Sequence, residues 1–425
     1  MKLFSLLALG AFINSIGTGL TAFGVATFVY TTFGNASAIA LTQLAAFAPI
    51  VLLSPVAGVL ADRLDRRLVM MAGDGGSVIG LAVVWFAVTQ PNPNLGLILA
   101  GLVLSSVFAA FTEPALRASV NDLVGEKDYV RTSGMLQFAA SAKYLFSPLL
   151  AGLLLRYSNL GILLLIDMST CLVTVVCSLA VRKAYGAASH ASSEEGFLSQ
   201  LRSGLRSLTA SRPVVVAVVL MTVLTFSLGF LQTLLKPVLL PIASVEQVGI
   251  AETITAVGMF AGAGMVALVG KGAPHRLLAM GIAGVGVAMV CLALVPNRWW
   301  IAGCGFVVFA SLSLCNAGGD VVVRTSIDNK HQGRAWGAIG FLSQLGFIMA
   351  YVVAGPLADG VFEPLLRPGG SLSGSIGTLI GTGAGRGTAL LIATLGVGTL
   401  LLAIAPLTVR MADAPKEPPA SDDGE

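Results

Sequence analysis

The chain has 425 residues, of which 56% are apolar and only 11% are charged, against about 25% charged in an ordinary soluble domain. So few charges cannot cover a soluble globule, and a mean hydropathy of +0.88 that extends along the whole chain excludes a single anchor or signal peptide as its source. The net charge of +4 is too small and too dispersed for a nucleic-acid surface. Because the apolar runs are continuous, they predict an all-α integral membrane protein and exclude a transmembrane barrel.

Twelve apolar runs, each about long enough to cross a bilayer, are separated by charged or turn-rich segments. They cover residues 4–31, 35–60, 68–90, 94–114, 132–156, 158–182, 213–240, 246–270, 274–295, 298–320, 333–362 and 385–410. A long polar interruption divides these spans six and six. We therefore expect an N-terminal six-helix half at 1–182, a cytoplasmic linker at 183–212, a C-terminal six-helix half at 213–411 and a disordered cytoplasmic tail at 412–425.

The basic residues concentrate in alternate loops. One set of loops carries Arg63, Arg66, Arg67, Arg117, Lys127, Arg131, residues 182–212, Lys271, Arg276, Arg324, Lys330 and Arg334. The other set carries only Arg156, Arg298, Arg367 and Arg386. Because Lys and Arg are retained on the cytoplasmic side, this asymmetry predicts a multi-pass protein of the cell inner (cytoplasmic) membrane with both termini in the cytoplasm.

Sequence signals for catalysis, cofactors or metals are lacking. The five cysteines lie inside apolar runs without a CxxC pair, and the three histidines lie in polar connections. The glycine-dense segment 369–387 has no Gly-Lys-Ser/Thr, so it is interpreted as an external loop and not as a phosphate site. We expect no enzymatic activity, no cofactor and no metal. The expected partners are the lipid bilayer, a small-molecule substrate and protons, with no nucleic acid, and the chain is expected to be a monomer.

An internal repeat connects the two halves. Glu113 and Arg117, with Ser119 after them, are matched 207 residues later by Asp320, Arg324 and Ser326. An acid and a base four residues apart lie on one face of a helix and can form an ion pair. Such pairs are common at helix ends, but the constant offset favours a repeated structural unit.

The loop after the second span carries a family signature. It reads GVLADRLDRR over residues 58–67, which resembles the cytoplasmic loop motif of the major facilitator superfamily. Asp65 replaces the usual glycine, and this variant resembles the branch that contains macrolide-efflux proteins and enterobactin-type siderophore exporters. Three further stretches, LIDMS at 165–169, QGR at 332–334 and GPLADGVFEP at 355–364, are similar to the same group of exporters.

The resemblance implies a fold and a function. It implies twelve transmembrane helices in two six-helix pseudo-symmetric halves that rock around a midplane cavity. It also implies a secondary active transporter, a proton-coupled exporter of a hydrophobic drug or of a secreted peptide or siderophore-like product, working by alternating access. Two alternatives stay open: an importer of a small organic solute with the same fold, and a non-transporting membrane sensor or assembly factor.

By resemblance, the signature loop forms a conformational latch. Asp62 can accept hydrogen bonds from the free amides at the N-terminus of a helix in the other half, where the helix dipole favours an anion. Arg63, Arg66 or Arg67 can reach Glu113 at the end of the fourth span. Alternatively, the arginines only set the topology. The latch candidates are Gly58, Asp62, Arg63, Arg66, Arg67, Glu113, Arg117, Asp320 and Arg324.

Ionisable residues at membrane depth are costly and indicate functional sites. The coupling candidates are Asp167, Lys143, Asp74 and Glu113. Lys143 and Asp167 differ in depth by about two turns or less, so a structural ion pair, a proton-coupling site and separate roles are all possible. Asp74 and Glu113 can titrate if they are buried, or pair with the basic loop.

Polar residues on the spans that line the cavity in the resembling family are candidates for binding substrate. They are Asn14, Thr18, Gln43, Gln137, Thr225, Gln232, Asn316 and Gln344. Amide and hydroxyl side chains also join membrane helices by hydrogen bonds, which is the alternative role for each of them. In the fifth span, Ser147 precedes Pro148 where related exporters have Gly-Pro, so we expect looser helix packing there, whereas Gly355-Pro356 is present in the second half.

Overall fold

The computed structural model describes residues 2–185, 212–269, 274–327 and 329–408. In these ranges the regular elements are all helical, and twelve helical segments are long and apolar enough to cross a membrane. The predicted all-α, twelve-span fold is therefore confirmed. Most of the expected linker, residues 186–211, and the expected tail lie outside the described residues.

Within the described residues, the first half contains eight α-helices and one short 3-10 turn, η1 Glu126–Asp128. The α-helices are α1 Lys2–Phe33, α2 Ala36–Arg63, α3 Arg66–Thr89, α4 Leu95–Ala109, α5 Thr112–Leu123, α6 Tyr129–Leu145, α7 Ser147–Tyr157 and α8 Leu160–Tyr185. Several begin where a short polar side chain can accept a backbone N–H: the side chains of Asn35, Asp65 and Asn94 each accept from an amide in the first turn of the helix that follows. The loops between the spans are short because these residues start the next helix at once.

The second half repeats this arrangement with a more elaborate end. Its elements are α10 Arg212–Leu239, α11 Val245–Val269, α12 Pro274–Leu294, α13 Arg298–Ser326, α14 Asn329–Leu357, the π-helical turn η2 Ala358–Phe362, α15 Glu363–Leu366, α16 Ile376–Ile380, α17 Arg386–Leu402 and α18 Ala405–Thr408. The glycine-dense segment lies between α15 and α17, and Gly369, Gly381, Gly383 and Gly385 adopt positive φ there, which favours glycine.

Two predicted spans consist of two helices each. The fourth span is divided between α4 and α5 at Ala110 and Phe111, and the fifth between α6 and α7 at Phe146. Pro148 explains the second break, because proline has no amide hydrogen to donate to the carbonyl four residues earlier and its ring crowds that carbonyl. The fourth span also extends to Val120, beyond its predicted end at residue 114. Its last turns carry Arg117, which lies beyond the predicted boundary, whereas Glu113 lies just inside it.

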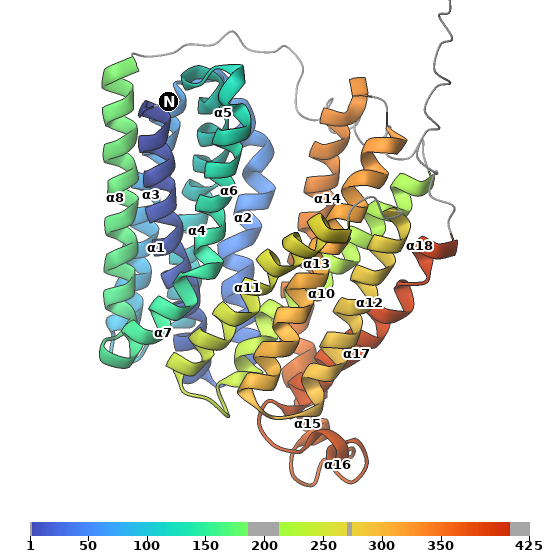
Figure 1. Ribbon diagram of the computed structural model, residues 1–425. Coiled ribbons are helices and arrows are strands. Elements are labelled where there is room, and N and C mark those ends of the chain that lie inside the picture. The colour runs from blue at the N-terminus through green and yellow to red at the C-terminus, as the bar shows by residue number, and fades with distance from the viewer. Residues whose placement is uncertain (1, 186–211, 270–273, 328, 409–425) are drawn as a thin grey trace, which may run out of the picture.

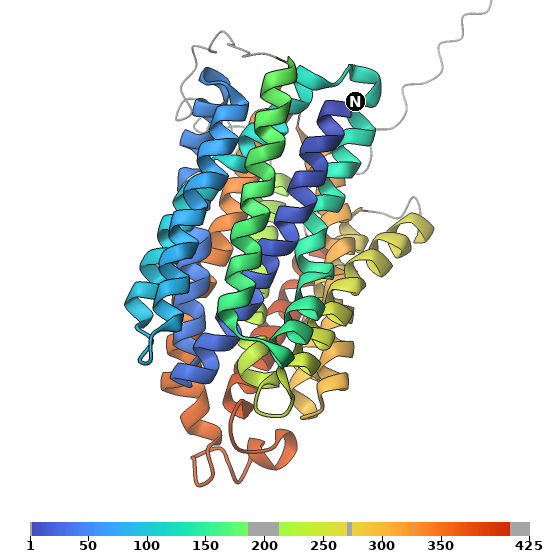
Figure 2. The ribbon, with the colours of Figure 1, turned by 90° about the vertical axis from the view of Figure 1, so that its left-hand side faces the viewer.

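Figure 1 shows the two halves as bundles that lie side by side, α1–α8 in one and α10–α18 in the other. We call the end that carries the N-terminus and the helix ends at Arg63, Arg182 and Arg324 the basic end. The ribbons of the halves diverge toward the basic end and meet at the opposite end (Figure 1). Figure 2 looks onto the first half, drawn in blue to green, which lies in front of the second.

Small residues allow the helices within each half to approach closely. A Cβ atom added to Gly101 of α4 would lie 2.8 Å from the carbonyl oxygen of Gly80 in α3. In the second half, a Cβ atom added to Gly286 of α12 would lie 2.8 Å from the carbonyl oxygen of Gly396 in α17. Since lipid chains are as apolar as the helices, close van der Waals packing of this kind is what holds a membrane bundle together.

Candidate functional site: a buried acidic cavity and the interface between the halves

The loop between α2 and α3 turns its charges toward its own half. Asp65 begins α3, where it accepts a hydrogen bond from the Arg67 amide at 3.1 Å, and its carboxylate pairs with Arg182 of α8 at 2.8 Å. Arg63 is exposed, and Gly58 has open space where a side chain would be. The side chain of Asp62 lies outside the described residues, so its latch role stays a prediction.

The expected contact between the basic loop and Glu113 was wrong. Arg66 and Arg67 instead pair with Asp122 of α5, at 2.5 Å and 2.9 Å, and the Arg67 side chain is fully buried. Asp122 lies nine residues beyond Glu113 on the same helix, about 13 Å nearer to the basic end, which is where the arginines begin α3. The sequence signal for this site is an acid near the end of the fourth span, but the spacing of the charges alone does not single out Asp122.

Glu113 forms the local ion pair that its spacing suggested. Its carboxylate accepts from Arg117 at 2.7 Å, and both side chains are more than half exposed. In the second half, Arg324 lies 5.9 Å from the ring centre of Trp336, and Asp320 is half-buried one helical turn before it.

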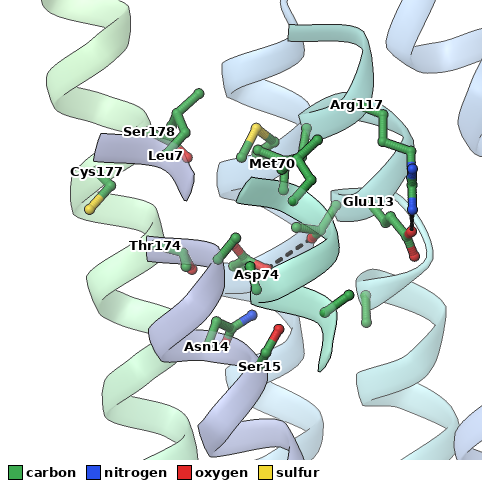
Figure 3. Close-up of a pocket in the computed structure, with 17 residues that line it drawn as sticks. Leu7, Asn14, Ser15, Met70, Asp74, Glu113, Arg117, Thr174, Cys177 and Ser178 are labelled. Atoms are coloured by element: carbon green, nitrogen blue, oxygen red, sulfur yellow. Dashed lines mark hydrogen bonds and ion pairs between the residues drawn. The ribbon is translucent and has the colours of Figure 1, made fainter. Parts of the chain in front are cut away.

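A cavity of about 220 Å³ lies inside the first half, lined by α1, α3, α5, α6 and α8 (Figure 3). Asp74 is its most buried acid, 3% exposed, and accepts a hydrogen bond from Thr112 at 2.9 Å through one carboxylate oxygen. The other carboxylate oxygen has no hydrogen-bond partner in the described structure, nor has the fully buried hydroxyl of Ser178 on the same wall. Glu113 and Arg117 form part of the opposite wall (Figure 3).

This cavity can hold water. Its volume exceeds several times the roughly 30 Å³ that one molecule occupies in the liquid, and its wall offers unpaired polar atoms. Asp74 has no Lys or Arg within ion-pair distance in the described part of the chain. The arrangement therefore connects a buried carboxyl with an exposed ion pair through a cavity wide enough for water, which suits binding and release of a proton.

Asp167, on α8, is a second buried acid in the same half. It is 2% exposed, and one of its carboxylate oxygens has no hydrogen-bond partner. Thr170, one turn further along α8, donates to the Asp167 carbonyl at 2.8 Å and contacts the side-chain oxygen of Asn14 at 3.4 Å. Asn14 in turn lines the cavity that holds Asp74. The two buried acids are thus separated by a short row of polar side chains.

Lys143 does not form an ion pair with Asp167 in this structure. Its ammonium group lies 5.7 Å from the ring centre of Tyr144. Helix α1 packs against both α6 and α8: a Cβ atom added to Gly19 would lie 2.8 Å from the Lys143 carbonyl oxygen, and one added to Gly17 would lie 2.9 Å from the Asp167 carboxylate. Of the three alternatives for this pair, a structural ion pair is therefore absent here.

The predicted substrate residues divide into two groups, with Gln43 apart from both. Thr18, Gln137, Asn316 and Gln344 are exposed. Three others join helices: Asn14 contacts α8, Thr225 donates to the Ser343 carbonyl at 2.7 Å, and Gln232 accepts from Tyr351 at 3.0 Å. Gln43 is half-buried.

An aromatic group crosses between the halves beside Gln232. Phe47 of α2 contacts Phe347 and Tyr351 of α14, with ring centres 5.6 Å and 5.8 Å apart in edge-on geometry. None of these three rings is among the polar candidates from the sequence, because residue type alone does not show which aromatic side chains meet across a bundle.

Further contacts join the halves at the end opposite the basic end. Arg156 of α7 pairs with Glu246 of α11 at 2.7 Å, and Asp359 accepts hydrogen bonds from the start of α2. Lys236 of α10 pairs with Glu252 at 2.5 Å and lies 4.6 Å from the ring centre of Phe23 in α1. The cost of charges at membrane depth could have identified Lys236 and Glu252 from the sequence.

The expected loose packing at Ser147 was wrong. Ser147 is fully buried, and its hydroxyl donates to the Ile16 carbonyl of α1 at 3.0 Å. The glycine that permits this approach is Gly19 on α1, where an added Cβ atom would collide with the Ser147 side chain. The small residue is supplied by the opposite helix, so serine at this position is compatible with tight packing.

Comparison with known proteins identifies relatives that match most of the chain. Residues 7–362 match the family model described as Major Facilitator Superfamily. Macrolide efflux protein A of Streptococcus pyogenes is 23% identical over 343 residues, which cover 77% of this chain and 82% of that protein. The protein of the same name from Enterococcus faecalis is 26% identical over 295 residues, covering 66% of this chain and 85% of that one.

Solved structures share the fold. The nucleoside transporter NupG matches with a TM-score of 0.74 at 13% identity, covering 96% of this chain and all (100%) of that chain. A bacterial homolog of the human lysosomal transporter Spinster, in an inward-facing and unoccupied conformation, matches with a TM-score of 0.68 at 13% identity and covers 95% of each chain. Both similarities concern the fold.

Proposed function

Because the chain belongs to the major facilitator superfamily, and is a membrane transporter and not an enzyme, we propose that it is a proton-coupled exporter of an apolar or amphipathic solute. The proposed solute classes are hydrophobic drugs and secreted peptide or siderophore-like products. The relatives named macrolide efflux proteins support export. Their names concern those proteins, so the solute of this chain has to be found by experiment.

The observation that carries the transport proposal is the one-sided closure of the two halves. Their contacts, such as Arg156 with Glu246 and Asp359 with Ala36, lie at one end of the bundle, and the ribbons diverge at the other (Figure 1). The excess of Lys and Arg in the loops at the divergent end supports its placement in the cytoplasm. With this orientation, the structure represents an inward-facing state that could accept a solute from the cytoplasm or the inner leaflet.

Proton coupling rests on Asp74 and Asp167. Each is almost fully buried with an unpartnered carboxylate oxygen, and Asn14 lies between their surroundings. A carboxyl that binds a proton loses its charge, and the cost of a charge at membrane depth depends on its surroundings, which change when the halves move. We infer that protonation of these carboxyls biases the balance between the two facing states. Glu113 would exchange protons between the cavity and water.

Solute binding rests on the exposed amides and on the aromatic group. Gln137 and Asn316 are exposed on different halves, and the rings of Phe47, Phe347 and Tyr351 meet between the halves. Aromatic faces and a few amides suit an apolar solute with scattered polar groups. We assign a structural role to Asn14 and Gln232, the amides that join helices.

The experiment is an efflux assay with a panel of labelled macrolides, cationic dyes and iron-chelating peptides, in cells that express the chain. We expect efflux of at least one class that collapses when a protonophore removes the gradient. Cells that carry an Asp74→Asn variant should lose gradient-driven efflux. Asp128→Asn is the control and should retain efflux, because the Asp128 side chain precedes α6 near the basic end without capping that helix by a hydrogen bond. Efflux that is insensitive to the protonophore would contradict proton coupling.

Vesicles of known orientation separate export from import. We expect inside-out vesicles to accumulate the solute when their interior is acidified. Accumulation only in right-side-out vesicles would replace the exporter proposal with the importer alternative. A third outcome is that the protein is present in the membrane and yet moves no solute in either kind of vesicle. If replacement of Gln137 and Asn316 then also leaves its physiological activity unchanged, a non-transporting role is favoured.

A further inference from the structure

A single carboxylate joins the end of α14 to the beginning of α2 across the two halves. Asp359 lies in the π-helical turn that follows α14. One of its oxygens accepts from the Ala36 amide at 2.9 Å, and the other accepts from the Ser37 amide at 2.7 Å and the Ser37 hydroxyl at 2.5 Å. These three hydrogen bonds connect residues more than 320 positions apart in the chain.

The acceptor completes the cap of α2. The first amides of a helix have no partner within the helix and carry the positive end of its dipole. Asn35, the residue before α2, accepts only from the Ala38 amide, at 2.8 Å. Asp359 accepts the amides of Ala36 and Ser37 that remain. Helix α2 is therefore capped jointly by its own half and by the other one, and separation of the halves at this end would expose two amides and a carboxylate.

The local packing is built for this contact. Gly355, near the end of α14, lies four residues before Asp359, and a Cβ atom added to it would collide with the backbone of Ser37. It would also lie 3.0 Å from the side chain of Ala40. The close approach of the two helices places the carboxylate at the amides, and a larger residue at 355 would push it away.

We propose that Asp359 is the latch that holds the two halves together at the end opposite the basic end, and that its release accompanies opening of that end. The proposal rests on the alternating-access part of the proposed function. It assigns to the second half the chemistry that the family signature assigns to Asp62 of α2: an aspartate that caps a helix of the other half. Helix α2 would then be held at one end through its amides and at the other through its carboxylate.

A neighbouring residue provides a matched control. Glu363 lies four residues after Asp359, and its carboxylate accepts from the amide and hydroxyl of Thr388 at the start of α17, at 3.0 Å and 2.6 Å. This cap has the same chemistry but joins two elements of one half. Glu363→Gln should therefore weaken a helix cap without changing the balance between facing states.

The test measures distances between spin labels by double electron–electron resonance on the full chain in nanodiscs. Labels are placed on cysteines at Tyr157 and Val295, which are 82% and 41% exposed and lie on different halves at the latched end. The five native cysteines are replaced by alanine. We expect Asp359→Asn to raise the ratio of open to closed populations about tenfold or more, the size expected from loss of one charge-assisted hydrogen bond. Glu363→Gln should leave the ratio unchanged.

Two further variants distinguish loss of the latch from misfolding. Ser37→Ala removes only the hydroxyl donor and should shift the populations in the same direction by a smaller factor. Asp359→Glu keeps the charge and should restore part of the closed population. An unchanged ratio in folded Asp359→Asn protein, or equal shifts in Asp359→Asn and Glu363→Gln, would overturn the latch. Because the readout needs neither solute nor a proton gradient, failure of the exporter proposal would leave these ratios as they are.

Discussion

The position of Asp122 along α5 determines which basic residues it pairs with and how deeply it is buried. Asp122 is the acid that neutralises Arg66 and Arg67 at the start of α3, and its side chain is only 3% exposed. Glu113, on the same helix, is exposed and pairs with its neighbour Arg117. The two acids differ in burial, so they should differ strongly in their contribution to stability.

We predict that Asp122→Asn destabilises the protein by about 3–5 kcal/mol, because removal of one partner leaves buried guanidinium charges without compensation. The melting temperature of the purified protein in detergent measures the effect. Glu113→Gln is the matched control, since an exposed pair contributes little and its loss should leave the melting temperature nearly unchanged. Equal losses in both variants would show that Asp122 does not hold the arginines as described.

Asp167 and Lys143 should separate in function as they do in space. We predict that Asp167→Asn abolishes gradient-driven efflux but spares exchange of labelled for unlabelled solute, because exchange needs no net proton movement. Lys143→Met should retain gradient-driven efflux, since no ion pair connects the two side chains. Efflux and exchange assays on reconstituted vesicles test both variants. Equal loss of exchange and efflux in Asp167→Asn would indicate a structural role for this carboxyl.

At the scale of helices, the close contact of α7 with α11 depends on glycine. A Cβ atom added to Gly249 of α11 would collide with the Pro148 carbonyl of α7 and lie 3.2 Å from Gly152. This contact joins the halves at the end opposite the basic end. We predict that Gly249→Ala shifts the populations of that end toward the open state, measured with the Tyr157 and Val295 labels. Gly264→Ala on the same helix, where nothing lies within 4 Å, should not shift them.

Asp62, at the end of α2, gives a second prediction at the scale of helices. Asp62→Asn should impair transport with little loss of membrane insertion, because a latch requires the charge whereas the topology depends on the neighbouring arginines. Efflux per amount of protein in the membrane measures the effect. Arg131→Gln, at an exposed position of α6 outside the latch candidates, is the control for a change of charge alone. Wild-type efflux in Asp62→Asn would contradict the latch at the basic end.

The helices could be predicted from the sequence more fully than the contacts between them. Bilayer thickness fixes the length of an apolar run, and every one of the twelve predicted spans corresponds to a helical segment within a few residues along most of its length. Contacts depend on how each helix is rotated and how deep each residue lies. For this reason Asp74 and Asp167 could be identified as buried acids, whereas Asp122 as the partner of the arginines and Gly19 as the partner of Ser147 could not.

In the whole molecule, the buried acids and the contacts that close the two halves lie in different places. The first half contains the buried acids, and the interface between the halves contains the aromatic group and the Asp359 contact. A change of protonation in one half can therefore alter solute access only if it changes how that half packs against the other. This requirement connects the coupling residues to the latches, and it makes proton movement and solute movement two readouts of one equilibrium.

The most direct test of this account is solute movement in proteoliposomes under an imposed pH gradient, with a labelled macrolide as the first solute. We predict movement against the direction of proton flow, even at equal solute concentrations on both sides, and its loss in Asp74→Asn and Asp167→Asn. Movement that follows only the solute's own gradient, at a rate that the pH gradient and these two substitutions leave unchanged, would contradict proton-coupled export.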